Sequence, residues 1–354
     1  MAENRKNKKV TIKDIAAEAG ISTAAVSLIL NNRPCRITEE KKSLVREVAK
    51  KRHYVVNQAA KSLATSRSHM LALILPDIEN MFFSSLAKQI EIRCRKNGYS
   101  LIITSSDDSS RNDRELLRTL ESRGVDGIFL IMSNESFEYE KELVRELNLL
   151  TMPYVMLDRT YRDLDCSRVR FDHEQGGYLA TKYLLEQGHR KIACVFKDDH
   201  VGNGRSRLDG YLKALKEFRI PVRQEYLYRG DYHQDSGYRA AGEILQTDAT
   251  AAFVCNDMMT LGFLRRMYEE KKHVPGDISL VSYDDSLKNY LLEVELTAVA
   301  QDLETLAQSA YDLMFCQLES GTEELPAEKI HDEVILQPRL RVRGSVLPAA
   351  FYDE

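Results

Sequence analysis

The sequence predicts a small all-α head followed by a larger α/β body made of two lobes of doubly wound parallel sheet. Near the N-terminus, apolar residues recur at helical spacing on both sides of a glycine. From Met70 onward, short apolar runs alternate with amphipathic stretches, which is typical of βαβ units. This alternation occurs in two successive series. Each series is long enough to form one lobe of the body.

Residues 10–31 (VTIKDIAAEAGISTAAVSLILN) predict two short helices joined by a tight turn. Thr11 can cap the first helix, and Asp14 follows three residues later in a capping-box arrangement. Gly20 ends this helix because glycine readily adopts the left-handed conformation of a helix terminus. Ser22 can then cap the second helix.

The second helix has two different faces. Val26, Ile29 and Leu30 form an apolar stripe that can pack against the first helix. The opposite face carries small or polar residues, namely Thr23, Ala24, Ser27, Leu28 and Asn31. Such a helix is typical of the helix-turn-helix motif that enters the DNA major groove. Small helical domains without a DNA role share the pattern, so the motif alone leaves both interpretations open.

The charge distribution favours a nucleic acid as the partner of the head. Residues 1–69 contain 15 Lys and Arg against 6 Asp and Glu, whereas the remaining chain contains 35 against 48. Basic side chains placed against phosphates release condensed counterions, which favours binding to DNA. The basic run RKNKK at residues 5–9 could equally be a solvated face.

A third helix and a short connecting segment follow. Thr38 suits the N-terminus of this helix, and Leu44, Val45, Val48 and Ala49 would close a three-helix head. Residues 57–64 (NQAAKSLA) predict a further short helix capped by Asn57. A helix of this length is unstable alone in water, so it should fold only against a partner. An ordinary flexible linker is the alternative interpretation.

The body contains apolar segments that we expect to be buried strands. They are residues 70–76, 100–104, 125–131, 153–157, 190–196, 225–230, 250–255 and 277–283. Ligands of doubly wound sheets bind outside the carboxyl ends of the strands. The expected ligand site is therefore a cleft between the two lobes.

The loops after these strands carry the candidate ligand-binding residues. They are Phe82, Phe83, Asp158, Arg159, Lys197, Arg207, Asn256, Asp257 and Asp284. Carboxylates, amides and guanidinium groups can hydrogen-bond vicinal hydroxyls, and aromatic rings can pack on a sugar ring. Each residue taken singly could instead cap a helix or end a strand. Their shared position at strand ends is what indicates a sugar-type site.

Composition excludes several other classes of protein. No apolar run is long enough to cross a membrane, and the N-terminus lacks a signal-peptide core, so we expect a cytoplasmic protein. The six cysteines are far apart and form no CxxC, which indicates neither a metal site nor a disulfide framework. Neither GxGxxG nor GxxxxGK[ST] occurs. We therefore expect no enzyme, no cofactor and no metal.

Taken together, the helix-turn-helix segment, NQAAKSLA, LALILPDIENMFF, GVDGIFLI, FDHEQGGYLATKYLLEQGHRKIA, CNDMMTLG and VPGDISLVSYDDS resemble the lactose-repressor/galactose-repressor family of bacterial regulators. The resemblance runs in order from about Val10 to about Arg343. It implies a head that reads a pseudo-palindromic operator as a homodimer and a hinge helix that enters the minor groove. It also implies a periplasmic-binding-protein-like body whose cleft holds a small effector.

The resemblance implies boundaries for these parts. The helix-turn-helix domain would cover residues 1–56, the hinge helix and linker 57–69, and the effector-binding and dimerisation domain 70–345. Within the body, the N-terminal lobe would take residues 70–166 and 298–328. The C-terminal lobe would take residues 167–297 and 329–345.

The resemblance also assigns roles in DNA binding. Base reading falls on Thr23, Ala24 and Leu28, and phosphate contacts fall on Ser22, Ser27 and Asn31. Thr11 and Asn57, which can cap their helices, are also expected to contact DNA, and Leu63 matches the leucine that wedges between base pairs. Many members carry arginine where this chain has Leu28, and proline where it has Val56. These departures put the operator sequence in doubt but not DNA binding.

For the effector, the resemblance implies that Arg207 and Asp284 clamp sugar hydroxyls. The segment around Lys197 and Arg207 is similar to that of arabinose-responsive repressors. We expect a sugar-responsive regulator, a repressor of carbohydrate-utilisation genes. A regulator that answers to a purine or a protein co-repressor is the alternative. A sugar-binding protein without a DNA role is the alternative from another functional class.

Overall fold

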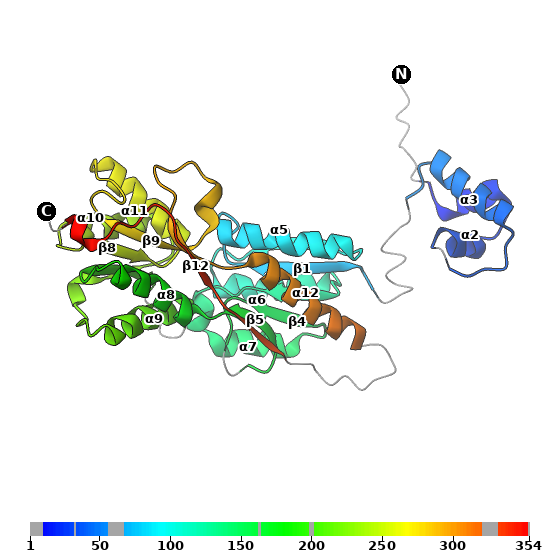
Figure 1. The fold of residues 1–354 in the computed structure, drawn as a ribbon. Coiled ribbons are helices and arrows are strands. Elements are labelled where there is room, and N and C mark those ends of the chain that lie inside the picture. The colour runs from blue at the N-terminus through cyan, green and yellow to red at the C-terminus, as the bar shows by residue number, and fades with distance from the viewer. Residues whose placement is uncertain are drawn as a thin grey trace, which may run out of the picture. The chain divides into compact units, whose positions relative to one another are not determined.

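The computed structural model describes residues 10–31, 33–55, 67–161, 164–197, 202–320 and 332–352. These residues belong to two compact units, Met1–Ser68 and His69–Glu354 (Figure 1). Each unit has a hydrophobic core of its own. The predicted fold class, an all-α head plus a two-lobed α/β body, is confirmed.

The head contains three helices, α1 (Ile12–Ala19), α2 (Thr23–Leu30) and α3 (Glu39–Lys51). Its core includes Ile15, Val26, Ile29 and Val45, which are almost fully buried. Leu44, which was expected in this core, is 42% exposed instead. It lies one residue off the stripe of α3 that faces the other helices, because Val45, Val48 and Ala49 are the buried residues there.

The helix ends of the head follow the predicted capping residues. The Asp14 carboxylate accepts the backbone N–H of Thr11 at 2.8 Å and the hydroxyl of Thr11 at 2.7 Å. Gly20 ends α1 at a φ of 66°, a left-handed conformation that favours glycine. The Ser22 hydroxyl accepts the N–H of Ala25 at 3.2 Å and caps α2. These local bonds fix the turn between α1 and α2.

The first lobe is a six-stranded sheet in the order β11-β5-β4-β3-β1-β2, and every neighbouring pair is parallel. Its strands are β1 (Met70–Leu75), β2 (Ser100–Ser105), β3 (Gly127–Leu130), β4 (Tyr154–Leu157), β5 (Ser167–Phe171) and β11 (Glu333–Leu336). Helices α5 (Met81–Lys96) and α12 (Leu303–Ser320) cover one face, and α6 (Ser110–Ser122) and α7 (Glu140–Leu149) cover the other. Both faces are therefore buried, as parallel sheets require.

The second lobe is a six-stranded sheet in the order β12-β10-β9-β8-β6-β7. Its strands are β6 (Ile192–Lys197), β7 (Leu227–Gly230), β8 (Ala251–Val254), β9 (Ser279–Asp284), β10 (Thr297–Ala300) and β12 (Arg339–Arg341). All neighbours are parallel except β12, which runs antiparallel to β10. Figure 1 shows α8 (His173–Glu186) and α9 (Asn203–Glu217) on one side of this sheet and α10 (Gln234–Ile244) and α11 (Asp257–Glu269) on the other.

The chain crosses between the lobes three times, after β5, after β10 and after β11. The predicted lobe boundaries are wrong at three strands. β5 and β11 lie in the first sheet rather than in the second lobe, and β10, most of which was assigned to the first lobe, lies in the second sheet. β11 follows α12 of the first lobe and pairs with the adjacent sheet edge. There Glu333 of β11 lies 2.8 Å from Arg170 of β5. The segment 329–345 is thus divided between the lobes.

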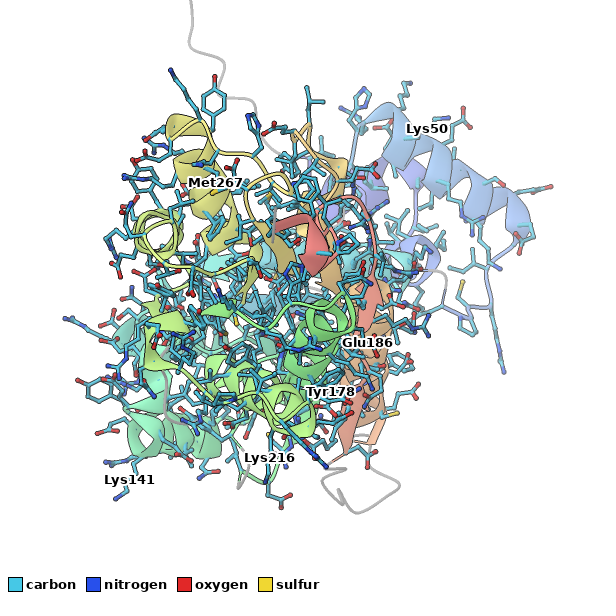
Figure 2. All side chains as sticks on the ribbon, turned by 60° about the vertical axis from the view of Figure 1, so that its left-hand side comes forward. Lys50, Lys141, Tyr178, Glu186, Lys216 and Met267 are labelled. Atoms are coloured by element: carbon cyan, nitrogen blue, oxygen red, sulfur yellow. The ribbon has the colours of Figure 1, made fainter. Side chains whose placement is uncertain are left out.

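The body exposes charged side chains and buries most of its thiols. Lys141 of α7 and Lys216 of α9 project outward from the body in Figure 2. Among the described residues, no helix is long and apolar enough to cross a membrane. Likewise, in these ranges no group of three or more His, Cys, Asp or Glu could hold a metal ion. Cys94, Cys166, Cys194 and Cys255 are buried, whereas Cys316 is exposed.

Candidate functional site

The helix-turn-helix offers an exposed helix start as its candidate DNA-reading face. Ser22, Thr23 and Ala24 are exposed at the N-terminus of α2, and Thr11 is exposed at the start of α1. Small side chains at the start of a helix allow close approach to base edges in the major groove. This turn of α2 is therefore the part of the described head best shaped for the groove.

The remaining predicted DNA contacts on α2 are half-buried. Ser27, Leu28 and Asn31 all fall in this class. The Asn31 amide donates back to the Ser27 carbonyl at 2.9 Å, so in this structure it serves the end of its own helix. The predicted contacts Asn57 and Leu63 lie outside the described residues.

The body has a narrow cleft at the carboxyl ends of both sheets. Its lining residues are Asn80, Phe82, Phe83, Asp158, Arg159, Asn203, Arg207, Tyr232, Asn256 and Asp284. The first five come from the first lobe and the other five from the second. The cleft is therefore an interlobe site, as the position of the loops predicted.

Arg207 of α9 is fixed at the centre of the second-lobe wall. Its guanidinium carbon lies 3.8 Å above the ring centroid of Tyr283, and Nη1 donates to the Cys255 carbonyl. Nη2 lies 3.5 Å from Oδ1 of Asp284, which also accepts the amide of Gln301 at 2.8 Å. Burial raises the pKa of Asp284 to about 6, although the charge of Arg207 opposes that rise. Asp284 is thus ionised at neutral pH.

Asp158 links the two walls of the cleft. Its Oδ2 accepts the amide of Asn203 at 2.9 Å, and its Oδ1 lies 3.3 Å from Nε2 of His173. Burial alone would raise the pKa of Asp158, but His173, Arg207 and Arg159 lower it below its ordinary value. Asp158 follows β4 of the first lobe, whereas Asn203 begins α9 of the second. Contacts of this carboxylate therefore hold the lobes close to each other.

Backbone strain accompanies both carboxylates. Asp158 has a φ of 57° and Asp284 a φ of 82°, values that residues other than glycine rarely adopt. Such conformations persist only where the surroundings impose them, and they concentrate at functional sites. The strain is consistent with a site whose acceptors are held in place before a ligand arrives.

The second guanidinium in the cleft has a carboxylate partner of its own. Nη1 of Arg159 lies 2.8 Å from Oδ1 of Asp108, and its guanidinium carbon lies 5.2 Å from the ring centroid of Phe83. Burial raises the pKa of Asp108, but the charge of Arg159 and hydrogen bonds from Asn134 lower it overall. Asp108 is therefore ionised, and it balances the charge of Arg159.

The structure brings together seven of the nine predicted effector residues, namely Phe82, Phe83, Asp158, Arg159, Arg207, Asn256 and Asp284. Lys197 is not among the lining residues, and its amine lies 5.8 Å from the Tyr232 ring. Asp257 is not among them either, because its carboxyl accepts the N–H of Ser286 at 2.6 Å behind the cleft. It faces a separate cavity of about 170 Å³. Burial and the neighbouring Asp284 raise the pKa of Asp257 well above its ordinary value.

Sequence reasoning missed three lining residues, Asn80, Asn203 and Tyr232. Asn80 lies inside the quoted loop PDIENMFF, where it caps α5 by accepting the N–H of Phe82 at 3.0 Å. Tyr232 follows β7, so the rule that selected the other loops would have found it. Asn203 is the first residue of α9 and carries no comparable signal.

Comparisons with known proteins agree with this arrangement. Residues 11–57 match the model for bacterial regulatory proteins of the lacI family, and residues 181–346 match a periplasmic binding protein-like domain. The transcriptional repressor PurR of Pectobacterium carotovorum is 32% identical over 347 residues, which is 97% of this chain and 98% of PurR. The chain belongs to the lacI family. It is accordingly a DNA-binding transcriptional regulator with an effector-binding domain, and not an enzyme.

Other family members give similar matches. PurR of Edwardsiella ictaluri is 32% identical over 97% of this chain and 98% of its own. A lacI-family regulator from Enterococcus faecium with bound ribose is 29% identical, covering 79% of this chain and 99% of its own, with a TM-score of 0.66. The regulator CelR in complex with cellobiose is 25% identical, covering 95% of this chain and 100% of its own, with a TM-score of 0.68. The two solved structures share the fold of this chain over the stretches that they cover.

Proposed function

We propose that this chain is a transcriptional repressor whose affinity for operator DNA is set by a sugar bound in the interlobe cleft. The observation that carries the proposal is the cleft lining, in which eight of ten side chains bear hydrogen-bonding groups and two are phenylalanines. A ligand rich in hydroxyls matches this lining, because each hydroxyl donates to a carboxylate and accepts from an amide or guanidinium. A largely apolar ligand would offer no hydrogen bonds to these polar groups.

The charges of the cleft favour a neutral ligand. Arg207 has Asp284 beside it, and Arg159 has Asp108. Asp158 adds a further ionised carboxylate. A phosphate group would meet these carboxylates as well as the guanidinium groups, and like charges repel. An unphosphorylated sugar avoids that cost.

The relatives support a small effector but divide on its class. The lacI-family regulator with bound ribose and the complex of the regulator CelR with cellobiose favour a sugar. The PurR repressors, 32% identical over almost the whole chain, favour the purine alternative. We retain the purine as the second candidate on this observation alone.

We propose the domain organisation expected from the sequence, with a head to residue 56, a hinge to residue 69 and the body thereafter. Two copies would read a pseudo-palindromic operator in the bacterial cytoplasm, since helix-turn-helix dimers bind paired half-sites. Thr23 and Ala24, exposed at the start of α2, would face base edges. The half-buried Leu28 would offer an apolar contact, for example with a thymine methyl group.

The mechanism we propose is a population shift between lobe arrangements. A sugar that touches Asp158 of the first lobe and Arg207 of the second has more contacts when the cleft is closed. A ligand shifts an equilibrium only through such a difference in affinity. In a dimer, a change of lobe arrangement would alter the spacing of the two hinges. Operator affinity would then follow sugar concentration.

A thermal-shift panel tests the proposal. The purified full-length protein is heated with D-ribose, L-arabinose, D-galactose or cellobiose, and separately with adenine, guanine or hypoxanthine. A ligand that binds the native state raises the melting temperature by mass action. A rise with a sugar and none with the bases supports the proposal. A rise with a base alone assigns the cleft to the purine candidate, and no rise with any compound contradicts both.

A further inference from the structure

The imidazole of His173 is buried directly behind the cleft. It is 4% exposed and is not among the lining residues. His173 is the first residue of α8, immediately after the first crossover between the lobes. Three groups face its ring nitrogens, namely Asp158 from the loop after β4, Arg207 from α9 and Tyr283 from β9. Two of these three residues, Asp158 and Arg207, line the cleft itself.

The neighbours of His173 determine which nitrogen carries the proton. Nδ1 lies 3.4 Å from both Nε and Nη2 of Arg207. A guanidinium group has only donors, so Nδ1 must be the acceptor and carry no proton. Nε2 lies 3.3 Å from Oδ1 of Asp158, but neither atom has a hydrogen-bond partner in the structure. The geometry therefore requires the neutral imidazole with its proton on Nε2.

We propose that His173 is a positioning residue, which holds Arg207 ready for the effector only while its imidazole is neutral. Mild acid would then weaken effector binding through His173, although His173 does not touch the effector. The dependence on an effector rests on the proposed function, whereas the protonation state of His173 does not.

The charges around His173 oppose its protonation. Burial and the charge of Arg207 lower the pKa of His173 below its usual 6.5, with Arg170 of β5 adding to this effect and Asp158 opposing it. If Nδ1 carried a proton, an N–H donor of His173 would face the N–H donors of Arg207. The new positive charge would be attracted only by Asp158, which already accepts a hydrogen bond from Asn203. Arg207 would therefore be pushed away from its present position.

Close packing prevents the backbones of α8 and α9 from moving apart to relieve this repulsion. A Cβ added at Gly177 of α8 would lie 2.0 Å from the carbonyl oxygen of Arg207. One added at Gly176 would lie 2.2 Å from the hydroxyl of Tyr283. The backbones of α8 and α9 are thus in direct contact beside His173. The guanidinium group is the part left to move, and it is also the part that faces the effector.

Two substitutions separate the contacts of His173. In His173→Asn, the amide oxygen can occupy the place of Nδ1 and accept from Arg207, but the contact with Asp158 is lost. In His173→Gln, the longer amide can reach Asp158 as a donor in place of Nε2. Neither amide titrates. If positioning of Arg207 is the role of His173, the Asn variant retains effector affinity near neutral pH and the Gln variant loses it.

The first test needs no effector. ¹⁵N-histidine NMR on the full-length protein resolves the ring nitrogens of the 8 histidines, and His173→Asn identifies the signals of His173. We expect the Nε2–H tautomer at about pH 7.5 and protonation only below pH 6.5. A proton on Nδ1, or a doubly protonated ring at that pH, would overturn the proposal.

The second test uses D-ribose as the probe, by thermal-shift titration between about pH 8 and pH 5. Asp284 also titrates near 6, so the quantity compared is the ratio of ribose affinities of the wild type and His173→Asn at each pH. We expect wild-type affinity to fall about tenfold further than that of the variant, since one pKa unit corresponds to tenfold. A ratio that does not change with pH would overturn the proposal. If ribose gives no shift in the wild type, the sugar hypothesis loses this ligand, and the NMR result alone decides the role of His173.

Discussion

Among single residues, Arg207 carries most of the proposed effector chemistry. Tyr283, Cys255 and Asp284 hold its guanidinium on three sides, and His173 approaches the fourth. A buried guanidinium with this many partners has little freedom to rotate. It can therefore meet a ligand hydroxyl without a large loss of side-chain entropy.

Replacing Arg207 with alanine should abolish the response to the effector. Hydrogen bonds to a charged group contribute about 1.5–3 kcal/mol, so we expect affinity at least about tenfold weaker. The fold should lose stability too, because Asp284 is left buried without its cation. Thermal-shift titration measures both effects. Lys216→Ala, an exposed lysine of the same helix, is the control. Unchanged affinity in Arg207→Ala would remove Arg207 from the site.

The pKa of Asp284 predicts that effector affinity falls in acid. Burial raises this pKa to about 6, so the carboxylate that would accept ligand hydroxyls is lost as pH falls through 6. The sign for folding is opposite. The folded state binds this proton more readily than the unfolded state, so Asp284 favours folding below its unfolded pKa and loses that contribution as pH rises toward 6. Affinity measured from about pH 5 to pH 8 checks the prediction. The prediction would be contradicted if the effector affinity of the wild type stayed as constant over this pH range as that of Asp284→Asn.

Single site residues were predictable from the sequence where they follow a recognisable strand, and were not predictable elsewhere. Asp158 and Asp284 follow apolar strands and were found by that rule. His173 follows β5, whose alternating SRVRF pattern was not recognised as a strand. The loop after it therefore carried no predicted site residue. The contact between His173 and Arg207 joins α8 to α9, and no local pattern reports it.

Among the elements, the pair α8 and α9 positions the second-lobe wall of the cleft. Gly177 lets the two helices approach until an added Cβ would lie 2.0 Å from the Arg207 carbonyl oxygen. This contact is with backbone, which cannot turn aside as a flexible side chain can. The location of Arg207 thus depends on a glycine in another helix.

Gly177→Ala should therefore destabilise the body and weaken effector binding together. Overpacking costs about 1–3 kcal/mol, and a contact with backbone belongs at the upper end. Urea unfolding and effector titration measure the two losses. Gly242→Ala in α10 is the matched control, because its Cβ would meet only the Arg266 side chain at 3.2 Å. Equal stability of the two variants would show that α8 and α9 can separate freely.

The N-terminus of α1 gives a prediction confined to the head. Asp14 accepts two hydrogen bonds from Thr11, and loss of such a cap costs about 1 kcal/mol. Asp14→Ala should therefore lower the stability of the head and its operator affinity, with effector binding unchanged. Circular dichroism melting and DNA titration measure these effects, and Lys13→Ala is the control. A loss of effector binding in Asp14→Ala would contradict the independence of the two sites.

Elements with strong apolar periodicity were predictable, and those built from short or alternating segments were not. All eight predicted strands are present, from β1 to β9 without β5. β10 (TAVA) and β12 (RLR) are too short and too small or polar to stand out. β11 lies within the segment 329–345, which was assigned to the wrong lobe at this strand. Its partner strand depends on where the chain lies after α12, and this is set by tertiary packing.

For the whole molecule, the central question is how the cleft communicates with the head. The described residues form two compact units with separate cores, so effector and operator occupy different parts of the chain. Within the body, two of the three crossovers contribute side chains that contact the cleft carboxylates, namely His173 to Asp158 and Gln301 to Asp284. The cleft carboxylates are thus in direct contact with two of the connections between the lobes. Binding at two such sites must be coupled reciprocally if it is coupled at all.

The most direct test of this account is operator affinity measured with and without the effector. An operator is selected from a library of pseudo-palindromic DNA, and fluorescence anisotropy follows its binding to the full-length protein at fixed salt concentration. The account predicts that a saturating concentration of the sugar that raises the melting temperature changes operator affinity about 5- to 150-fold. It also predicts that Arg207→Ala binds the operator but no longer responds to that sugar. Identical operator affinity with and without the bound sugar would contradict the account.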